Sequence, residues 1–159
     1  MCGIAGLIHR GKTSNVGDEL QQMLQALKHR GPDSTGYALY ADNDGKNFIM
    51  RFKVGENVGE GSTSVNEDDS VYDKRKEHVD QMLKNLNATV VKEEKLTTYS
   101  YRYEMKYDQD LMEFSKKIES IESVEILSIG KSLELIKDLG DAQAVSERYD
   151  LGKVKGTHG

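Results

Sequence analysis

The chain has 159 residues, of which 31% are charged, and it carries a net charge of −5 and a single cysteine. This length suits one domain, or one domain with a small insertion, but not two full domains. An acidic surface without a basic patch argues against nucleic acid as a partner. No apolar run approaches the roughly 18 residues of a membrane helix, so no membrane partner is expected. One cysteine excludes an internal disulfide framework, and without a signal-peptide pattern we expect a cytoplasmic protein.

The first 54 residues predict a strand, a helix and two further strands. A small apolar run over residues 3–8 predicts a buried strand. Apolar side chains then recur at helical spacing, which predicts a helix that begins near Asp18 and packs on the core. These side chains are Leu20, Met23, Leu24 and Leu27. Gly31 and Pro32 end this helix. Residues 36–41 and 47–53 predict two strands joined as a hairpin through 42–45.

Residues 55–70 are rich in glycine, serine and acidic residues, and this composition predicts a linker. Beyond it, helix 71–86, strand 88–96, strand 99–107, helix 108–120 and strand 123–129 are expected. This order approximates a ferredoxin-like unit that lacks or borrows its first strand. Tyrosines alternate along residues 99–107, which predicts core packing under helices rather than a base-stacking surface. Residues 130–139 and 142–149 predict two helices.

Cys2 stands directly behind the initiator Met1. On removal of Met1, one carbon would carry both a thiol and a free α-amino group. A thiol of pKa about 8.5 needs a modest push to become a thiolate. An N-terminal amine of pKa about 7.7–8.0 is partly neutral at pH 7 and accepts a proton. The alternative is that Cys2 is only a small residue at a frayed terminus.

A second motif lies about thirty residues on, where the sequence reads His29-Arg30-Gly31-Pro32-Asp33-Ser34-Thr35-Gly36. Together with Met1-Cys2-Gly3-Ile4, it resembles class II glutamine amidotransferases, which have the N-terminal-nucleophile hydrolase fold. The stretches 130–134 and 155–159 resemble the subgroup related to the amidotransferase part of archaeal-type glutamate synthase. The resemblance covers residues 1–54 and 130–159. The expected fold is therefore α+β: a partial amidotransferase domain that carries the ferredoxin-like unit 71–129 as an insertion.

The resemblance implies that Cys2 attacks the side-chain amide of glutamine and releases ammonia for a synthase partner. It implies that Arg30, Gly31 and Asp33 frame the substrate site. Arg30 would brace the Cys2 terminus or the pocket wall, and Asp33 would act as a cap or turn residue rather than as a base. No cofactor is expected, and the four histidines have no metal-ligand spacing.

In the family, the Gly-Thr-His-Gly stretch is followed by a His-Thr-Arg motif whose Arg holds the glutamine carboxylate. An Asn-Gly pair that forms the oxyanion hole and an acidic residue that holds the substrate amine come further on. This sequence does not contain them, so only the N-terminal half of the domain is expected and the isolated chain should be a poor glutaminase. The alternative is a non-catalytic binding or regulatory subunit that docks on a partner supplying the missing half. A third possibility is a free-standing ferredoxin-like ligand binder.

Overall fold

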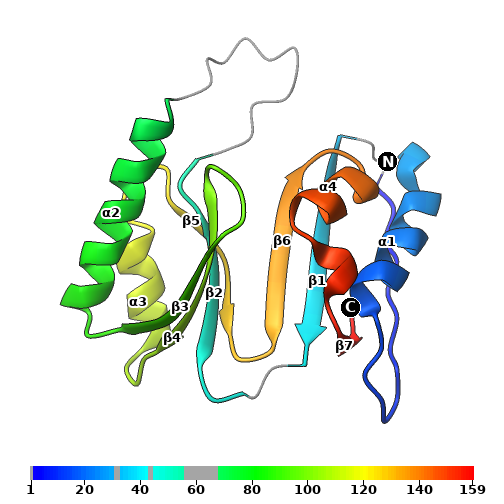
Figure 1. The fold of residues 1–159 in the computed structure, drawn as a ribbon, viewed down its shortest axis with the longest axis horizontal. Helices are drawn as coiled ribbons and strands as arrows, with labels where there is room; N and C mark the ends of the chain where they lie inside the picture. Colours follow the sequence, from blue (N-terminus) through cyan, green and yellow to red (C-terminus); the bar gives the residue numbers. More distant parts are fainter. Residues whose placement is uncertain (1, 31–32, 43–44, 56–67) are drawn as a thin grey trace. The chain divides into compact units, whose positions relative to one another are not determined.

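The computed structural model describes residues 2–30, 33–42, 45–55 and 68–159. The chain forms two compact units, one built from residues up to Gly45 together with Ser132–Gly159, the other from Lys46–Lys131. Each unit has its own antiparallel sheet and its own α-helices (Figure 1). The protein is therefore a mixed α/β chain with antiparallel sheets, which confirms the predicted α+β class at this level.

The first unit has a three-stranded sheet in the order β6-β1-β7. Its elements are α1 (Val16–Ala26), the 3-10 helix η1 (Lys28–Arg30), β1 (Ser34–Ala41), β6 (Leu133–Leu139), α4 (Ala142–Arg148), the 3-10 helix η2 (Leu151–Lys153) and β7 (Gly156–His158). Tyr37 and Leu39 point to the buried face of β1. Helix α4 contacts this strand, and α1 packs against α4. Because side chains alternate along a strand, the other face of β1 is left outside this core.

The N-terminal segment forms no regular strand, so the predicted buried strand over residues 3–8 is wrong. Ile8 makes a single bridge to His158, and His9 N donates to the Thr157 carbonyl at 2.7 Å. The segment is therefore held along β7. It is not buried: Ile4 is 92% exposed and Ile8 is 74% exposed. The apolar run did not lead to burial, because no layer of the described chain covers these side chains.

The second unit has a four-stranded sheet in the order β3-β4-β2-β5. Its elements are β2 (Phe48–Lys53), α2 (Asp69–Asn85), β3 (Thr89–Lys95), β4 (Ser100–Lys106), α3 (Leu111–Ile118) and β5 (Glu125–Gly130). The chain order β-α-β-β-α-β is that of ferredoxin-like units. Both helices lie on the same side of this sheet (Figure 1), over a core that contains Phe52, Tyr103 and Phe114. The alternating tyrosines of β4 are core residues, as their spacing predicted.

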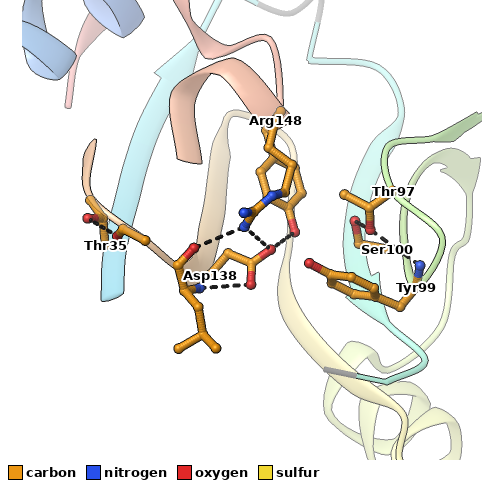
Figure 2. Close-up of polar contacts among 9 residues, drawn as sticks. Thr35, Thr97, Tyr99, Ser100, Asp138 and Arg148 are labelled. Atoms are coloured by element: carbon orange, nitrogen blue, oxygen red, sulfur yellow. Dashed lines mark hydrogen bonds and ion pairs between the residues drawn. The ribbon is translucent and has the colours of Figure 1, made fainter. Parts of the chain in front are cut away.

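The β3-β4 turn is closed by polar contacts. Thr97 Oγ1 lies 2.8 Å from Ser100 Oγ, and Tyr99 N donates to Thr97 Oγ1 at 3.3 Å (Figure 2). Leu96 N donates to the Ser100 carbonyl at 2.9 Å. These bonds fix the register in which β4 enters the sheet.

Two predictions about strand partners and type are wrong. Residues 36–41 and 47–53 do not form a hairpin, because β1 pairs with β6 and β7 while β2 pairs with β4 and β5. The strand at 47–53 is thus the one that the ferredoxin-like pattern was expected to lack or borrow. Residues 130–139 are not helical, since 133–139 form β6. Most of the predicted linker 55–70 lies outside the described residues, and Asp69 and Ser70 already belong to α2.

Candidate functional site

A pocket of about 400 Å³ lies in the first unit and brings the two motifs of the sequence together. Cys2, Arg30 and Asp33, three of the four predicted site residues, line it. Gly31, the fourth, lies outside the described residues. The remaining lining residues are Gly3, Leu24, Leu27, Lys28, His29, Ser34, Thr35, Gly36 and Ala142. The pocket thus takes its walls from the N-terminal segment, the end of α1, η1, the start of β1 and the start of α4.

Cys2 is a free, exposed cysteine at this pocket. The backbone beside it approaches α1 closely, since a Cβ on Gly3 would lie 3.1 Å from the Cβ of Leu27 and 3.6 Å from that of Arg30. A Cβ at position 3 would therefore be tight against Leu27, which would have to shift by a few tenths of an ångström. A glycine after the cysteine therefore lets the thiol sit at the end of α1.

The opposite wall is fixed by hydrogen bonds between β1 and the start of α4. Thr35 Oγ1 donates to the Gly140 carbonyl at 2.9 Å, and Gly140 N donates to the Asp33 carbonyl at 3.0 Å. The buried hydroxyl of Tyr37 donates a hydrogen bond to the Ala142 carbonyl at 2.7 Å. Burial is the main cause that raises the pKa of Tyr37 well above its usual value, so this hydroxyl stays a donor. The wall is therefore rigid where Asp33 and Thr35 enter the pocket.

Helix α4 is capped at this same wall. Asp141 accepts a hydrogen bond from Ala144 N at 3.0 Å and another from Gln25 Nε2 at 3.2 Å. These two bonds, the first of them the larger cause, hold the pKa of Asp141 below its usual value. The Gln25 side chain also accepts a hydrogen bond from Gln143 N at 3.1 Å. One side chain of α1 therefore bonds both to the capping residue Asp141 and to the first turn of α4. The relative position of α1 and α4 around the pocket is thereby set.

The pocket holds charges of both signs. Among the described lining residues, Lys28 and Arg30 are cationic and Asp33 is a carboxylate, and the charge of Lys28 also acts on Asp141 at the start of α4. Within the part of the chain that the structure describes, the Arg30 guanidinium has no ion-pair partner. A site with side chains of both charges suits a zwitterionic ligand.

Sequence reasoning assigned no role to Lys28, His29, Ser34 or Thr35, although all four stand inside or beside the quoted motif. Their position next to Arg30 and Asp33 was the available signal. Ala142 had no such signal, because it reaches the pocket only through the packing of α4 on β1.

The described residues show neither a metal centre nor a membrane-spanning helix. Across residues 2–30, 33–42, 45–55 and 68–159, no group of three or more His, Cys, Asp or Glu side chains is arranged to hold a metal ion. In the same ranges, no helix has both the length and the apolar character required to cross a membrane.

Comparison with known proteins adds to this geometry. Residues 1–55 match the family model of a glutamine amidotransferase domain. The chain is also similar to a protein of Methanothermobacter thermautotrophicus named "Putative glutamine amidotransferase", with 33% identity over 165 aligned residues. That alignment covers 99% of this chain and 50% of the relative, so the chain spans about half the length of the curated protein it matches. Its first 55 residues, which hold Cys2, Arg30 and Asp33, are thus similar to a glutamine amidotransferase domain.

Proposed function

We propose that this chain is the nucleophile-bearing part of a class II glutamine amidotransferase with the N-terminal-nucleophile fold. The observation that carries the proposal is the meeting of Cys2, Arg30 and Asp33 at one pocket inside the segment that matches the amidotransferase family model. The exposed thiol is open to a substrate.

The proposed reaction begins once Met1 has been removed. The α-amino group of Cys2 takes the thiol proton, and the thiolate attacks the side-chain amide carbon of glutamine. The C–N bond breaks, the amine returns its proton to the leaving nitrogen, and ammonia departs from a γ-glutamyl thioester. Water then cleaves the thioester to give glutamate and the free thiol. Ammonia passes to a synthase partner.

Arg30, with its fork of donors, would brace the Cys2 terminus or the pocket wall, and Lys28 would add positive charge beside it. Asp33 and Gly31 would shape the turn that frames the substrate. The groups that hold the carboxylate and the amine of glutamine would come from a partner or from further sequence. Replacing Arg30 with Ala should therefore slow the reaction of Cys2 with glutamine, since the site would lose its brace.

We expect the isolated chain to turn over slowly. Among the described lining residues there is no Asn or Gln side chain to donate to the oxyanion of the tetrahedral intermediate. An oxyanion donor is commonly worth about 10²–10³ in rate. A partner, or further sequence of the kind present in the longer relative, would supply such donors.

A second candidate function is a non-catalytic subunit that docks on a partner carrying the rest of the site. The outer face of the β6-β1-β7 sheet favours it. Leu135 lies opposite Ala38, and Leu139 lies opposite Ser34, and both leucines are more than a third exposed. Ile8 is on the same side of the adjoining segment, since it pairs with His158, which pairs with Tyr40. Exposed apolar side chains gathered on one sheet face, here beside the exposed Lys137, are typical of a surface that another layer of protein covers.

Trapping the thioester tests the first function. Protein whose intact mass shows loss of Met1 would be incubated with glutamine and hydroxylamine, which converts a thioester to a hydroxamate. We expect slow formation of γ-glutamyl hydroxamate by the wild-type chain and none by Cys2→Ser. Equal amounts from both proteins would refute the role of Cys2. No hydroxamate from either, together with self-association of the chain, would favour the docking subunit.

A further inference from the structure

The described residues that line a second cleft, of about 310 Å³, all belong to the unit Lys46–Lys131. We call it the lysine cleft. Its lining residues come from one end of the four-stranded sheet and the turns beside it: Lys46, Phe48, Asn87, Thr89, Lys106, Tyr107, Asp108 and Lys131. It shares none of them with the pocket that Cys2 lines, so the proposed reaction does not account for it.

The sheet register explains why three lysines meet there. Lys106 ends β4 and lies opposite Thr89, the first residue of β3. Lys131 follows Gly130, which lies opposite Ile49 of β2. Lys46 precedes β2, which runs between β4 and β5. Adjacent strands are about 4.8 Å apart, so these positions span roughly two strand spacings, and lysine stems are long enough to converge on one ligand.

The charge in the cleft opposes that of the chain. The described lining residues of the cleft include three lysines and one carboxylate, Asp108, in a protein whose net charge is −5. Like charges gathered at a cleft repel one another, so a bound anion would stabilise the arrangement.

Lys106 and Lys131 also differ from several other lysines of this unit. Lys76, Lys92 and Lys117 each form an ion pair with a carboxylate at 2.8–2.9 Å. Across the residues that the structure describes, Lys106 and Lys131 form none. The Lys131 ammonium lies over the ring of Phe48, 5.2 Å from its centroid. An aromatic ring restrains the position of this ammonium but does not neutralise its charge, so it can still bind an anion.

We propose that the lysine cleft binds a phosphorylated small molecule through its phosphate group. A phosphate monoester carries about −1.5 to −2 charge at pH 7, which suits a cleft where Lys106 and Lys131 have no ion pair within the described residues. Its several acceptor oxygens suit ammonium groups that act as point charges, with the Thr89 hydroxyl and the Asn87 amide as neutral donors. The cleft lies at the small end of the volume range of ligand sites, which fits a compact metabolite.

The test is a titration of the full chain with inorganic phosphate at constant ionic strength, followed by ¹⁵N-resolved NMR. We expect saturable shifts at Asn87, Thr89 and Tyr107. The double variant Lys106→Gln/Lys131→Gln should bind at least about tenfold more weakly, because each charged hydrogen bond contributes strongly. The double variant Lys106→Arg/Lys131→Arg keeps both charges, and its phosphate affinity should stay within about threefold of the wild-type value.

Lys116→Gln is the matched control. Lys116 is an exposed lysine of α3 that lines neither cleft and has no ion pair in the described part of the chain. Phosphate affinity should be unchanged in this variant. Shifts that never saturate, or an equal loss of affinity in Lys116→Gln and in the Gln double variant, would overturn the proposal. Equally tight binding of malonate, a dicarboxylate, would overturn the preference for phosphate.

Discussion

Leu7 and Gly159 exchange both of their backbone hydrogen bonds: Leu7 N donates to the Gly159 carbonyl at 3.0 Å, and Gly159 N donates to the Leu7 carbonyl at 3.1 Å. The segment that carries Cys2 is therefore paired with the Gly156–Gly159 stretch, which lies at the far end of the sequence. The position of Cys2 at the pocket depends on this pairing, because no described strand close in sequence pairs with the N-terminal segment.

Gly156→Ala should disturb this pairing. A Cβ at position 156 would overlap the carbonyl oxygen of Tyr40, which belongs to the backbone and has little room to move. Overpacking of this kind costs about 1–3 kcal/mol. We expect a lower melting temperature and faster alkylation of Cys2 by iodoacetamide. Gly152→Ala is the control, since nothing lies within 4 Å of a Cβ there, and it should leave both quantities unchanged. Equal effects of the two variants would contradict the pairing argument.

Tyr37→Phe should destabilise the wall between β1 and α4. The substitution keeps the ring but removes the donor to the Ala142 carbonyl, and a buried acceptor left unpaired costs about 1–3 kcal/mol. Chemical denaturation would measure the loss. Tyr40→Phe serves for comparison, because in the described residues the Tyr40 ring stacks on His158 and its hydroxyl makes no hydrogen bond. A Tyr40→Phe loss as large as that of Tyr37→Phe would show that the hydroxyl bond is not the cause.

Acid should weaken the contacts that hold His9 and Ser14 to Glu19 in the first turn of α1. Hydrogen bonds from Ser14 and from His9, the first being the larger cause, hold the pKa of Glu19 below its usual 4.5. As the pH falls, Glu19 thus binds a proton at a higher pH in the unfolded chain than in the folded chain. The contribution of Glu19 is present above about pH 4.5 and is lost as the pH drops through its lower folded value.

Glu19→Gln should accordingly flatten the acid side of a plot of melting temperature against pH between pH 3 and pH 7. Glu122→Gln provides the control, because Glu122 is exposed and has no hydrogen bond or ion pair within the described residues. If both variants give the wild-type slope, the Ser14–Glu19–His9 contacts do not stabilise the fold.

Asp138→Ala should be among the more damaging changes in the first unit. Asp138 is 4% exposed, accepts from the Tyr149 hydroxyl at 2.8 Å and pairs with Arg148 at 3.2 Å, as Figure 2 shows for the two charged side chains. Removing one partner of a buried pair costs about 3–5 kcal/mol, and we expect the lower end because the Arg148 side chain stays 30% exposed.

Lys153→Gln is the comparison for Asp138→Ala. Lys153 pairs with Asp150 on the surface, where the two side chains are 81% and 65% exposed. Surface pairs contribute about 0–1 kcal/mol, so thermal unfolding should hardly change. A loss in Lys153→Gln comparable to that in Asp138→Ala would mean that burial does not set the difference.

The sequence predicted the elements of the second unit well because their apolar residues follow the period of their structure. Tyr101, Tyr103 and Met105 alternate along β4, and all three are buried. Strand β6 was misread because its pattern is inverted. It buries Glu134 and Asp138 and exposes much of Leu135 and Leu139. The buried carboxylate of Asp138 is tolerated only because Arg148 and Tyr149 reach it, and no local pattern reveals those partners.

The site was partly visible in the sequence for a related reason. Cys2, Arg30 and Asp33 stand in two short motifs, and the structure places them at one pocket. The pairing of Leu7 with Gly159 and the contribution of Ala142 arise from contacts between distant segments. Such contacts depend on which strands share a sheet, and strand spacing alone does not specify this choice.

The most direct measurement of the central claim is the intact mass of the chain before and after incubation with a diazo-ketone analogue of glutamine. The account predicts loss of Met1, a single adduct, protection by excess glutamine, and no adduct in Cys2→Ala. An adduct that persists in Cys2→Ala would contradict the assignment of Cys2 as the glutamine-directed nucleophile. An unmodified protein whose Cys2 is free at the N-terminus would mean that the isolated chain does not form the glutamine pocket.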